Sequence, residues 1–201
     1  ICIEQQLDLD LLELLEAAAQ SFPAELKAGS TIKPVFDYVM DRLRGYYQER
    51  SISVDLVEAV LATRPTSLLD IDRRIQACRN FRALPEAESL AAANKRISNI
   101  LKKTDQASPE SVDTEKLEDS AEIELAKQLE SLQTDVVPLM NAGDYTPALE
   151  QLAALRKAVD SFFDQVMVMV DDEALRSNRL ALLQTLNRLF LRVADLSHLQ
   201  N

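Results

Sequence analysis

Basic and amide side chains recur at helical spacing between residues 93 and 103. With about 100° of turn per residue, a helix here would gather cations and an amide within an arc of about 120°. The residues on this polar side are Lys95, Arg96, Asn99, Lys102 and Lys103, and Ala93, Ile97, Ile100 and Leu101 lie on the other side. Such a face suits a phosphate backbone, and its amide can read base edges. A solvated basic face near a helix C-terminus gives the same pattern, so both interpretations stay open.

A second polar cluster opens the last predicted helix, which begins near Asp171. Acidic residues at positions 171–173 suit a helix N-terminus. Asp172 and Arg176 are four residues apart and could form a local ion pair, which competes with a binding role for Arg176. Asn178 and Arg179 have no such neighbour, and we expect both to be free to face a partner.

Two further groups have a structural and a functional interpretation. Tyr46 and Tyr47 could stack on unpaired bases, but packing in the core or at its edge is favoured. Arg73 and Arg74 both lie within helical reach of Asp70, which favours local ion pairs.

No arrangement of residues predicts catalysis or metal binding. His198 is the only histidine and Cys2 and Cys78 are the only cysteines, which argues against a histidine-based triad, a metal cluster and a disulfide framework. No glycine-rich phosphate loop occurs. Carboxylates are numerous, but on helices they usually form a solvated face. We therefore predict neither catalytic nor metal-binding residues, and the cysteine usage fits a reduced, cytoplasmic setting.

The charge of the chain is divided unequally. The 201 residues carry 22 Lys and Arg against 33 Asp and Glu, a net charge of −11, which at first argues against a nucleic-acid partner. Residues 42–103, however, hold 12 Lys and Arg against 7 Asp and Glu, a net charge of +5. The remaining residues carry −16, so a basic segment is joined to an acidic remainder. No apolar run approaches the length of a membrane span.

Hydrophobic residues recur at three- and four-residue spacing almost throughout, and only 3 glycines occur, which disfavours hairpins. The pattern predicts an all-α fold, an antiparallel bundle of about eight helices. The first predicted helix covers residues 4–20, the second follows an N-cap at Ser30 or Thr31, and the third runs from near Ser53 to Pro65. The fourth covers residues 67–82, the fifth covers 85–103, and the sixth ends near Asn141. The seventh starts with Thr146 as N-cap and Pro147 in the first turn and reaches Phe163, and the last begins near Asp171.

Polar, acidic and proline-containing residues at 104–117 are typical of a linker. We divide the chain into an N-terminal helical segment, residues 1–83, and a helical domain, residues 84–201. The chain begins at Ile1 rather than Met, which suggests part of a longer protein.

Several long motifs resemble the β subunit of bacterial glycyl-tRNA synthetase. They are Leu84–Glu88 with Ala91–Lys103, Phe36–Asp37 to Asp41–Tyr46, Val60–Pro65, Phe162–Met169 and Glu173–Leu180. The last part also resembles a wider class of anticodon-binding bundles named for an Asp-Ala-Leu-Arg (DALR) box. Here the box is Glu173-Ala174-Leu175-Arg176, with the charge of its first residue kept.

The resemblance implies a DALR-type anticodon-binding bundle in the C-terminal part. It also implies that this chain contacts glycine tRNA while the α subunit of a heterotetramer carries the ATP- and Mg²⁺-dependent glycine–tRNA ligase site. On this view the chain serves protein biosynthesis in the cytoplasm, binds neither DNA nor membrane, and has no cofactor or catalytic site of its own. Combined with face geometry, it assigns tRNA contact to Lys95, Arg96, Asn99, Lys102, Lys103, Arg176, Asn178 and Arg179.

An alternative comes from the leucine-rich first helix. A helix with unpartnered leucines could make the chain chiefly a scaffold or interaction module that docks on the rest of the β subunit or on the α subunit.

Overall fold

The computed structural model describes residues 1–26, 28–104 and 111–199. In these ranges the regular elements are helices, apart from one isolated backbone bridge between Asp10 and Ser67. The α-helices are α1 (Leu11–Gln20), α2 (Ile32–Glu49), α3 (Val54–Leu61), α4 (Leu68–Arg82), α5 (Ala87–Lys102), α6 (Ser120–Asn141), α7 (Tyr145–Ala153), α8 (Arg156–Gln165) and α9 (Glu173–Leu191). Short 3₁₀ turns cover Ala24–Leu26, Ala28–Thr31, Thr114–Lys116 and Leu196–Leu199. The predicted all-α bundle is confirmed.

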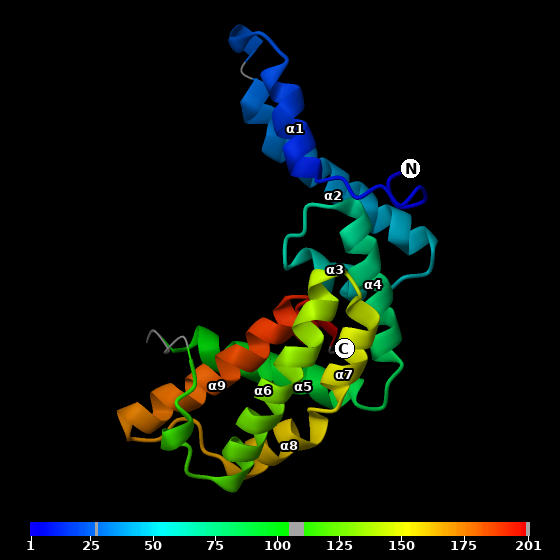
Figure 1. Cartoon of the computed structure of the whole chain (residues 1–201). Coiled ribbons are helices and arrows are strands. Elements are labelled where there is room, and N and C mark those ends of the chain that lie inside the picture. The colour runs from blue at the N-terminus through cyan, green and yellow to red at the C-terminus, as the bar shows by residue number, and fades with distance from the viewer. Residues whose placement is uncertain (27, 105–110, 200–201) are drawn as a thin grey trace.

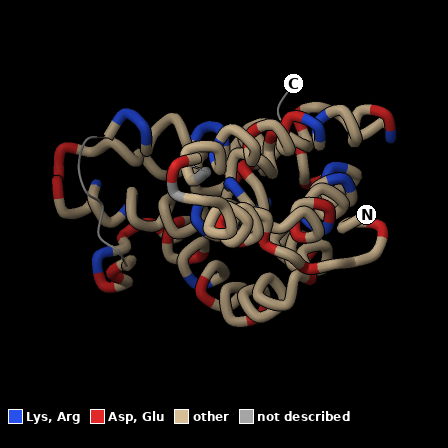
Figure 2. The backbone as a smooth tube through the Cα atoms, turned by 90° about the horizontal axis from the view of Figure 1, so that it is seen from above, with Lys and Arg blue, Asp and Glu red and all other residues tan. Residues whose placement is uncertain are grey.

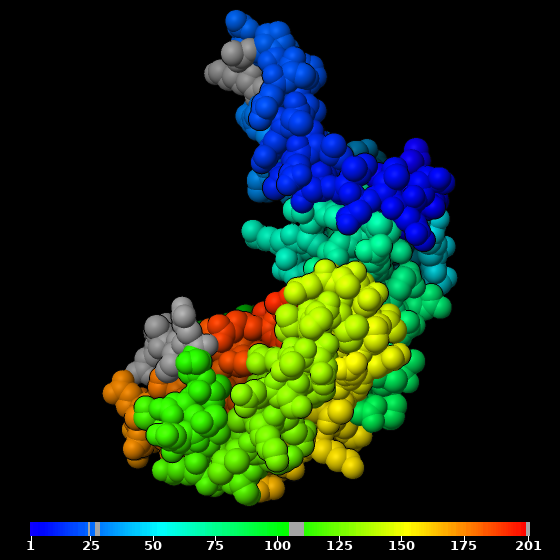
Figure 3. Space-filling view, viewed as in Figure 1, coloured from blue at the N-terminus to red at the C-terminus, as the bar shows by residue number. Residues whose placement is uncertain are grey.

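The molecule consists of a bundle and a projecting arm (Figure 1). Helices α3 to α9 form the bundle, and one continuous buried core runs from the second half of α2 to the last 3₁₀ turn. We call residues 11–26 and 28–38 the arm; it contains α1, which has no buried residue, and the first turns of α2. The space-filling view shows a recess between the arm and the bundle, with part of α9 along its lower side (Figure 3).

Contacts between distant segments hold the bundle together. Helix α4 packs against α7, and the 3₁₀ turn Leu196–Leu199 packs against α5 and α3. The Asp195 amide donates to the Ala59 carbonyl at 2.8 Å, which fixes the end of the chain on α3. Helix α9 contacts both α5 and α6. Helix α9, which carries three of the candidate residues, therefore lies beside α5, which carries the others.

Side-chain caps and one glycine explain several helix ends. The Asp10 carboxylate accepts from the Leu12 and Glu13 amides at the start of α1, and the Asp172 carboxylate accepts from the Leu175 amide at 2.9 Å. Gly143 ends α6 with a φ of 79°, the left-handed conformation that glycine adopts without a steric penalty.

Three predicted helix positions need correction. The first helix begins at Leu11 rather than residue 4, because Gln6 has a φ of 51° and Asp10 caps the helix. The predicted seventh helix is two helices that separate at Ala154 and Leu155. Helix α7 packs on α4, whereas α8 packs on α5, and one straight helix cannot reach both. The N-cap of α7 is Asp144 rather than Thr146.

The predicted linker is partly ordered against the bundle. Residues 105–110 lie outside the described residues. Of the rest, Val112 packs against the core, Leu117 is buried, and Thr114–Lys116 form a 3₁₀ turn. The predicted boundary near Leu84 falls in the turn between α4 and α5, and the buried core continues on both sides of it.

Candidate nucleic-acid interface

Helix α5 separates its apolar and basic residues as the sequence indicates. Leu90, Ala93 and Ile97 are buried against the core. The exposed residues on the opposite side are Lys95, Arg96, Asn99, Lys102 and Lys103, which we call the α5 basic face. Lys95 and Lys102 are seven residues apart, two helical turns, so their side chains leave the helix in nearly the same direction. The expected clustering of these five residues on one exposed face is confirmed.

The cations of the α5 basic face are not neutralised by local ion pairs. In the described part of the chain, no carboxylate lies within 4.0 Å of the amino or guanidinium groups of Lys95, Arg96, Lys102 or Lys103. The Arg96 guanidinium instead lies 4.3 Å from the centre of the Phe163 ring on α8, which orients it by a cation–π contact. Between these side chains is a shallow hollow of about 340 Å³. Positive charge is thus available to an anionic partner.

The DALR box opens α9, but its arginine is bound differently from the expectation. The Arg176 guanidinium donates to the Val170 carbonyl at 2.7 Å and to the Asp171 carbonyl at 3.3 Å. Asp172 caps the helix with its carboxylate. The expected Asp172–Arg176 ion pair does not form; Arg176 is half-buried and fastens the loop before α9.

Asn178 and Arg179 are not free to face a partner, so that expectation is wrong. The Asn178 amide accepts from the Asp113 N–H at 2.8 Å and donates to the Asp113 carbonyl at 2.9 Å. Arg179 is 4% exposed and donates to the Glu122 carboxylate at 2.8 Å, to Asp119 at 2.7 Å and to the Met167 carbonyl at 2.9 Å. Both residues join α9 to segments distant in the sequence.

Glu122 is the buried carboxylate at the centre of this network. Burial raises the pKa of Glu122, but the Arg179 guanidinium and the Asp119 and Glu118 amides bind the carboxylate and hold that pKa below 4.5. The folded protein therefore releases this proton more readily than the unfolded chain. The resulting stability is present at neutral pH and is lost as the pH falls below about 4.5.

The two tyrosines and Arg74 have the favoured structural roles, whereas the expected Arg73–Asp70 ion pair does not form in the described structure. Tyr47 is buried and its hydroxyl donates to Asp72 at 2.9 Å, while the Tyr46 ring packs edge-on against it. The Arg74 guanidinium donates to Asp70 at 2.6 Å and also binds the Arg192 and Val193 carbonyls. Arg73, in contrast, is exposed beside Gly143.

A second set of cations was missed by sequence reasoning. Arg188 and Arg192 are exposed near the end of α9 and line a groove between α9 and α6. Their four-residue spacing was the available signal, because it places them on one helix face. It was overlooked because the spacing does not reveal that α6 packs alongside.

Positive and negative side chains are interspersed over the molecule, and the described residues offer no candidate group of metal ligands and no candidate membrane-spanning helix. Figure 2 shows short Lys and Arg segments scattered among Asp and Glu segments along a tube that is mostly of other residues. Positive surface is therefore local. No group of three or more His, Cys, Asp or Glu residues in the described ranges could hold a metal ion. None of the helices described is long and apolar enough to cross a membrane.

The curated proteins that we compare with this chain are glycine–tRNA ligase beta subunits from several bacteria. The chain is 52% identical over 200 residues to the glycine–tRNA ligase beta subunit of Aeromonas salmonicida (strain A449), and 50% identical over 200 residues to that of Tolumonas auensis (strain DSM 9187 / NBRC 110442 / TA 4). It is 48% identical over 197 residues to that of Pseudomonas aeruginosa (strain LESB58). These alignments cover 98% to 100% of this chain but only 29% of each relative.

A protein family also matches the bundle directly. The DALR anticodon binding domain matches residues 90–196, which is more than half of the chain. The match begins in α5, includes both the α5 basic face and the DALR box, and ends in the last 3₁₀ turn. The chain belongs to the DALR anticodon binding domain family.

Proposed function

We propose that this chain binds the anticodon region of glycine tRNA as part of a glycine–tRNA ligase β subunit. The observation that supports this most directly is the α5 basic face, an exposed cationic helix surface inside a DALR domain, with no ion-pair partner among the described residues. Lys and Arg on this face would hold phosphates, and the Asn99 amide would be available to base edges. Arg176 would support the loop before α9, while Asn178 and Arg179 serve the fold.

The mechanism proposed is recognition rather than bond making. Glycine anticodons end in two cytosines, which can be splayed from an RNA loop and read by hydrogen bonds. Binding energy from this remote contact would position the acceptor end of the tRNA for chemistry elsewhere. By resemblance, that chemistry occurs in the cytoplasm at the α subunit of a heterotetramer, where ATP and Mg²⁺ are bound, with no cofactor bound by this chain.

The proposal is tested by removing two cations from the α5 basic face of the complete protein. We expect Lys95→Ala combined with Lys102→Ala to weaken glycine tRNA binding and to flatten its logarithmic salt dependence by about one to two units. Lys127→Ala combined with Lys157→Ala removes two exposed lysines from α6 and α8 and is the matched control. If the α5 double variant keeps the affinity and salt dependence of the unmodified protein, the α5 basic face does not contact RNA.

A second role is supported by the arm. Phe22 and Leu26 at its tip are 54% and 63% exposed, and Leu14 on α1 is 48% exposed. Apolar side chains gathered on a projecting element are typical of an interaction surface. We propose that the arm docks on another part of the complete β subunit, since this chain spans only 29% of its relatives' length.

A further inference from the structure

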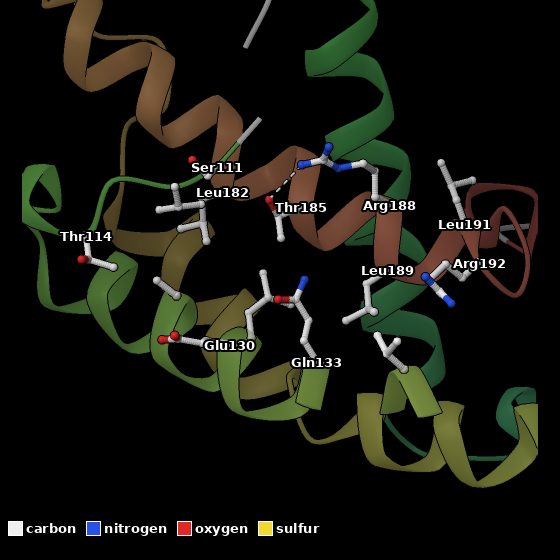
Figure 4. A pocket seen from close by; sticks show the side chains of 14 residues that line it. Ser111, Thr114, Glu130, Gln133, Leu182, Thr185, Arg188, Leu189, Leu191 and Arg192 are labelled. Carbon is white, nitrogen blue, oxygen red and sulfur yellow. Dashed lines mark hydrogen bonds between the residues drawn. The ribbon is translucent and has the colours of Figure 1, made fainter. Parts of the chain in front are cut away.

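A groove lies between α6 and α9 on the described bundle. It measures about 760 Å³ and opens on the bundle surface, with the segment 111–114 closing one end (Figure 4). Its floor is apolar and is formed by Ala126, Leu129, Val137, Leu182 and Leu189. Leu129, Leu182 and Leu189 are buried and belong to the core, so the floor is formed by the fold itself. A flat ring could lie on it without further rearrangement.

Polar side chains border this floor from opposite walls, among them Glu130 and Gln133 on α6 and Thr185 and Arg188 on α9. Gln133 points into the groove from α6, and Thr185 lies across from it on α9 with the Arg188 guanidinium beside its hydroxyl (Figure 4). The Thr185 hydroxyl donates to the Ala181 carbonyl at 2.9 Å and accepts from Arg188 at 3.4 Å. The Gln133 amide offers both a donor and an acceptor. The Gln133 side chain can therefore form hydrogen bonds with a ligand edge that carries both a donor and an acceptor.

Further arginine side chains lie beside the groove, on the side toward the middle of the molecule. Arg192 lines the groove and also an adjoining hollow of about 380 Å³, which Arg74 and Asn141 line as well. The Arg192 guanidinium donates to the neutral Asn141 side-chain oxygen at 2.6 Å, so this bond leaves its charge in place. An anionic group leaving the groove on this side would meet positive charge.

The end of the groove is held in place by Asn178. Ser111, Val112 and Thr114 line the groove, and the Asn178 amide binds both backbone groups of Asp113 between them. This pair of hydrogen bonds fixes the returning chain on α9. The groove is thus bordered on three sides by ordered structure.

We propose that this groove holds one unpaired base of the bound RNA. The inference rests on the proposed function, because it names where a base of the anticodon region would lie. The apolar floor would cover one face of the base, and the Gln133 amide would meet its Watson–Crick edge. Arg192 would bind a flanking phosphate. A base is preferred to an apolar peptide because the floor is bordered by an amide, a hydroxyl and cations together.

The test combines protein variants with RNA that lacks single bases. The complete protein is titrated with glycine tRNA and with glycine tRNA made abasic at each anticodon position in turn. Ala126→Phe fills the groove without removing a polar group, and Gln133→Ala removes the edge contact. Gln128→Ala is the matched control, because Gln128 lies on α6 outside the groove and its amide donates to Glu124. Thermal melting shows whether each variant is folded.

At one anticodon position, we expect the abasic change to weaken binding by about tenfold or more in the unmodified protein and in Gln128→Ala. In Ala126→Phe and Gln133→Ala the same change should cost markedly less, because the base contact is already lost. An equal abasic cost in all four proteins would overturn the inference while leaving the proposed function intact. A groove-filling variant that lowers only the melting temperature would point to a protein segment in the groove and would also overturn it. If the unmodified protein does not prefer glycine tRNA to a tRNA with an unrelated anticodon, the proposed function fails and the inference with it.

Discussion

At the residue scale, the Arg179–Glu122 pair shows how a residue of the DALR region can serve the fold. Glu122 is fully buried and Arg179 nearly so. We expect Arg179→Ala to lower the free energy of unfolding by about 3–5 kcal/mol, because it leaves a buried carboxylate without its cation. Denaturant unfolding of the variant measures this loss.

The same pair provides an internal control. Adding Glu122→Gln to Arg179→Ala should recover part of the loss, because the amide oxygen can still accept from the Asp119 and Glu118 amides without carrying a charge. Equal stability of the single and double variants would contradict this explanation. An unfolding free energy for Arg179→Ala within about 0.5 kcal/mol of the unmodified protein would contradict the pairing itself.

These residues also show where sequence reasoning ended. Spacing alone predicts the exposed side of α5, because Leu90 and Ile97 need only some apolar residue of the core to pack against, and the prediction does not depend on which residue that is. The burial of Arg179 did not follow, since its partner Glu122 lies 57 residues earlier. A local rule examines neighbours three or four positions away, and there Arg179 has no carboxylate to pair with. Its lack of a local partner was mistaken for availability.

At the element scale, the pairing of Asn178 with Asp113 joins the chain after the undescribed residues 105–110 to α9. We expect Asn178→Ala to destabilise the protein by about 1–3 kcal/mol, because the buried Asn178 amide and its two hydrogen bonds to the Asp113 backbone are lost. Hydrogen exchange at the Asp113 amide should accelerate more than exchange in the α9 core.

Asn187→Ala, on the same helix, is the matched substitution and should leave Asp113 exchange unchanged. Unaltered Asp113 exchange in Asn178→Ala would show that Val112 and Leu117 suffice to hold the segment. The sequence indicated a linker here from its polar composition, and that composition conceals the two apolar anchors that fasten it.

The division between α7 and α8 is a similar limit of periodicity. Leucines and phenylalanines continue at helical spacing through Leu155, which is fully buried. The spacing is therefore unbroken although the helix is not. The break is set by packing on α4 and α5, which a pattern within one segment does not contain.

At the scale of the whole molecule, charge and shape point to different partners. The net charge of −11 obscured a basic helix, because charges were summed over surfaces that face different ways. If this chain binds RNA as proposed, the acidic remainder would repel RNA from those other surfaces and so limit binding to one region. The arm, in contrast, is notable for exposed apolar side chains, which suit a protein surface.

The arm yields a prediction for the complete protein. If it docks on another part of the β subunit, Leu14 and Phe22 are covered there. Leu14→Ser combined with Phe22→Ser should then lower the free energy of unfolding by more than about 2 kcal/mol, since burying each side chain contributes about 1.5–3 kcal/mol. Hydrogen exchange across residues 11–20 should also accelerate in this variant, because α1 has no buried residue of its own to hold it.

Met167→Ser combined with Met169→Ser is the matched control. These residues are 71% and 57% exposed on the bundle, so the substitutions also remove exposed apolar surface but away from the arm. We expect that double variant to stay within about 0.5 kcal/mol of the unmodified protein. An arm variant as stable as this control, with unchanged exchange in α1, would mean that the arm faces water and that apolar docking is wrong. A loss confined to the arm variant would instead identify the arm as the part of this chain that fastens the DALR bundle to the rest of the protein.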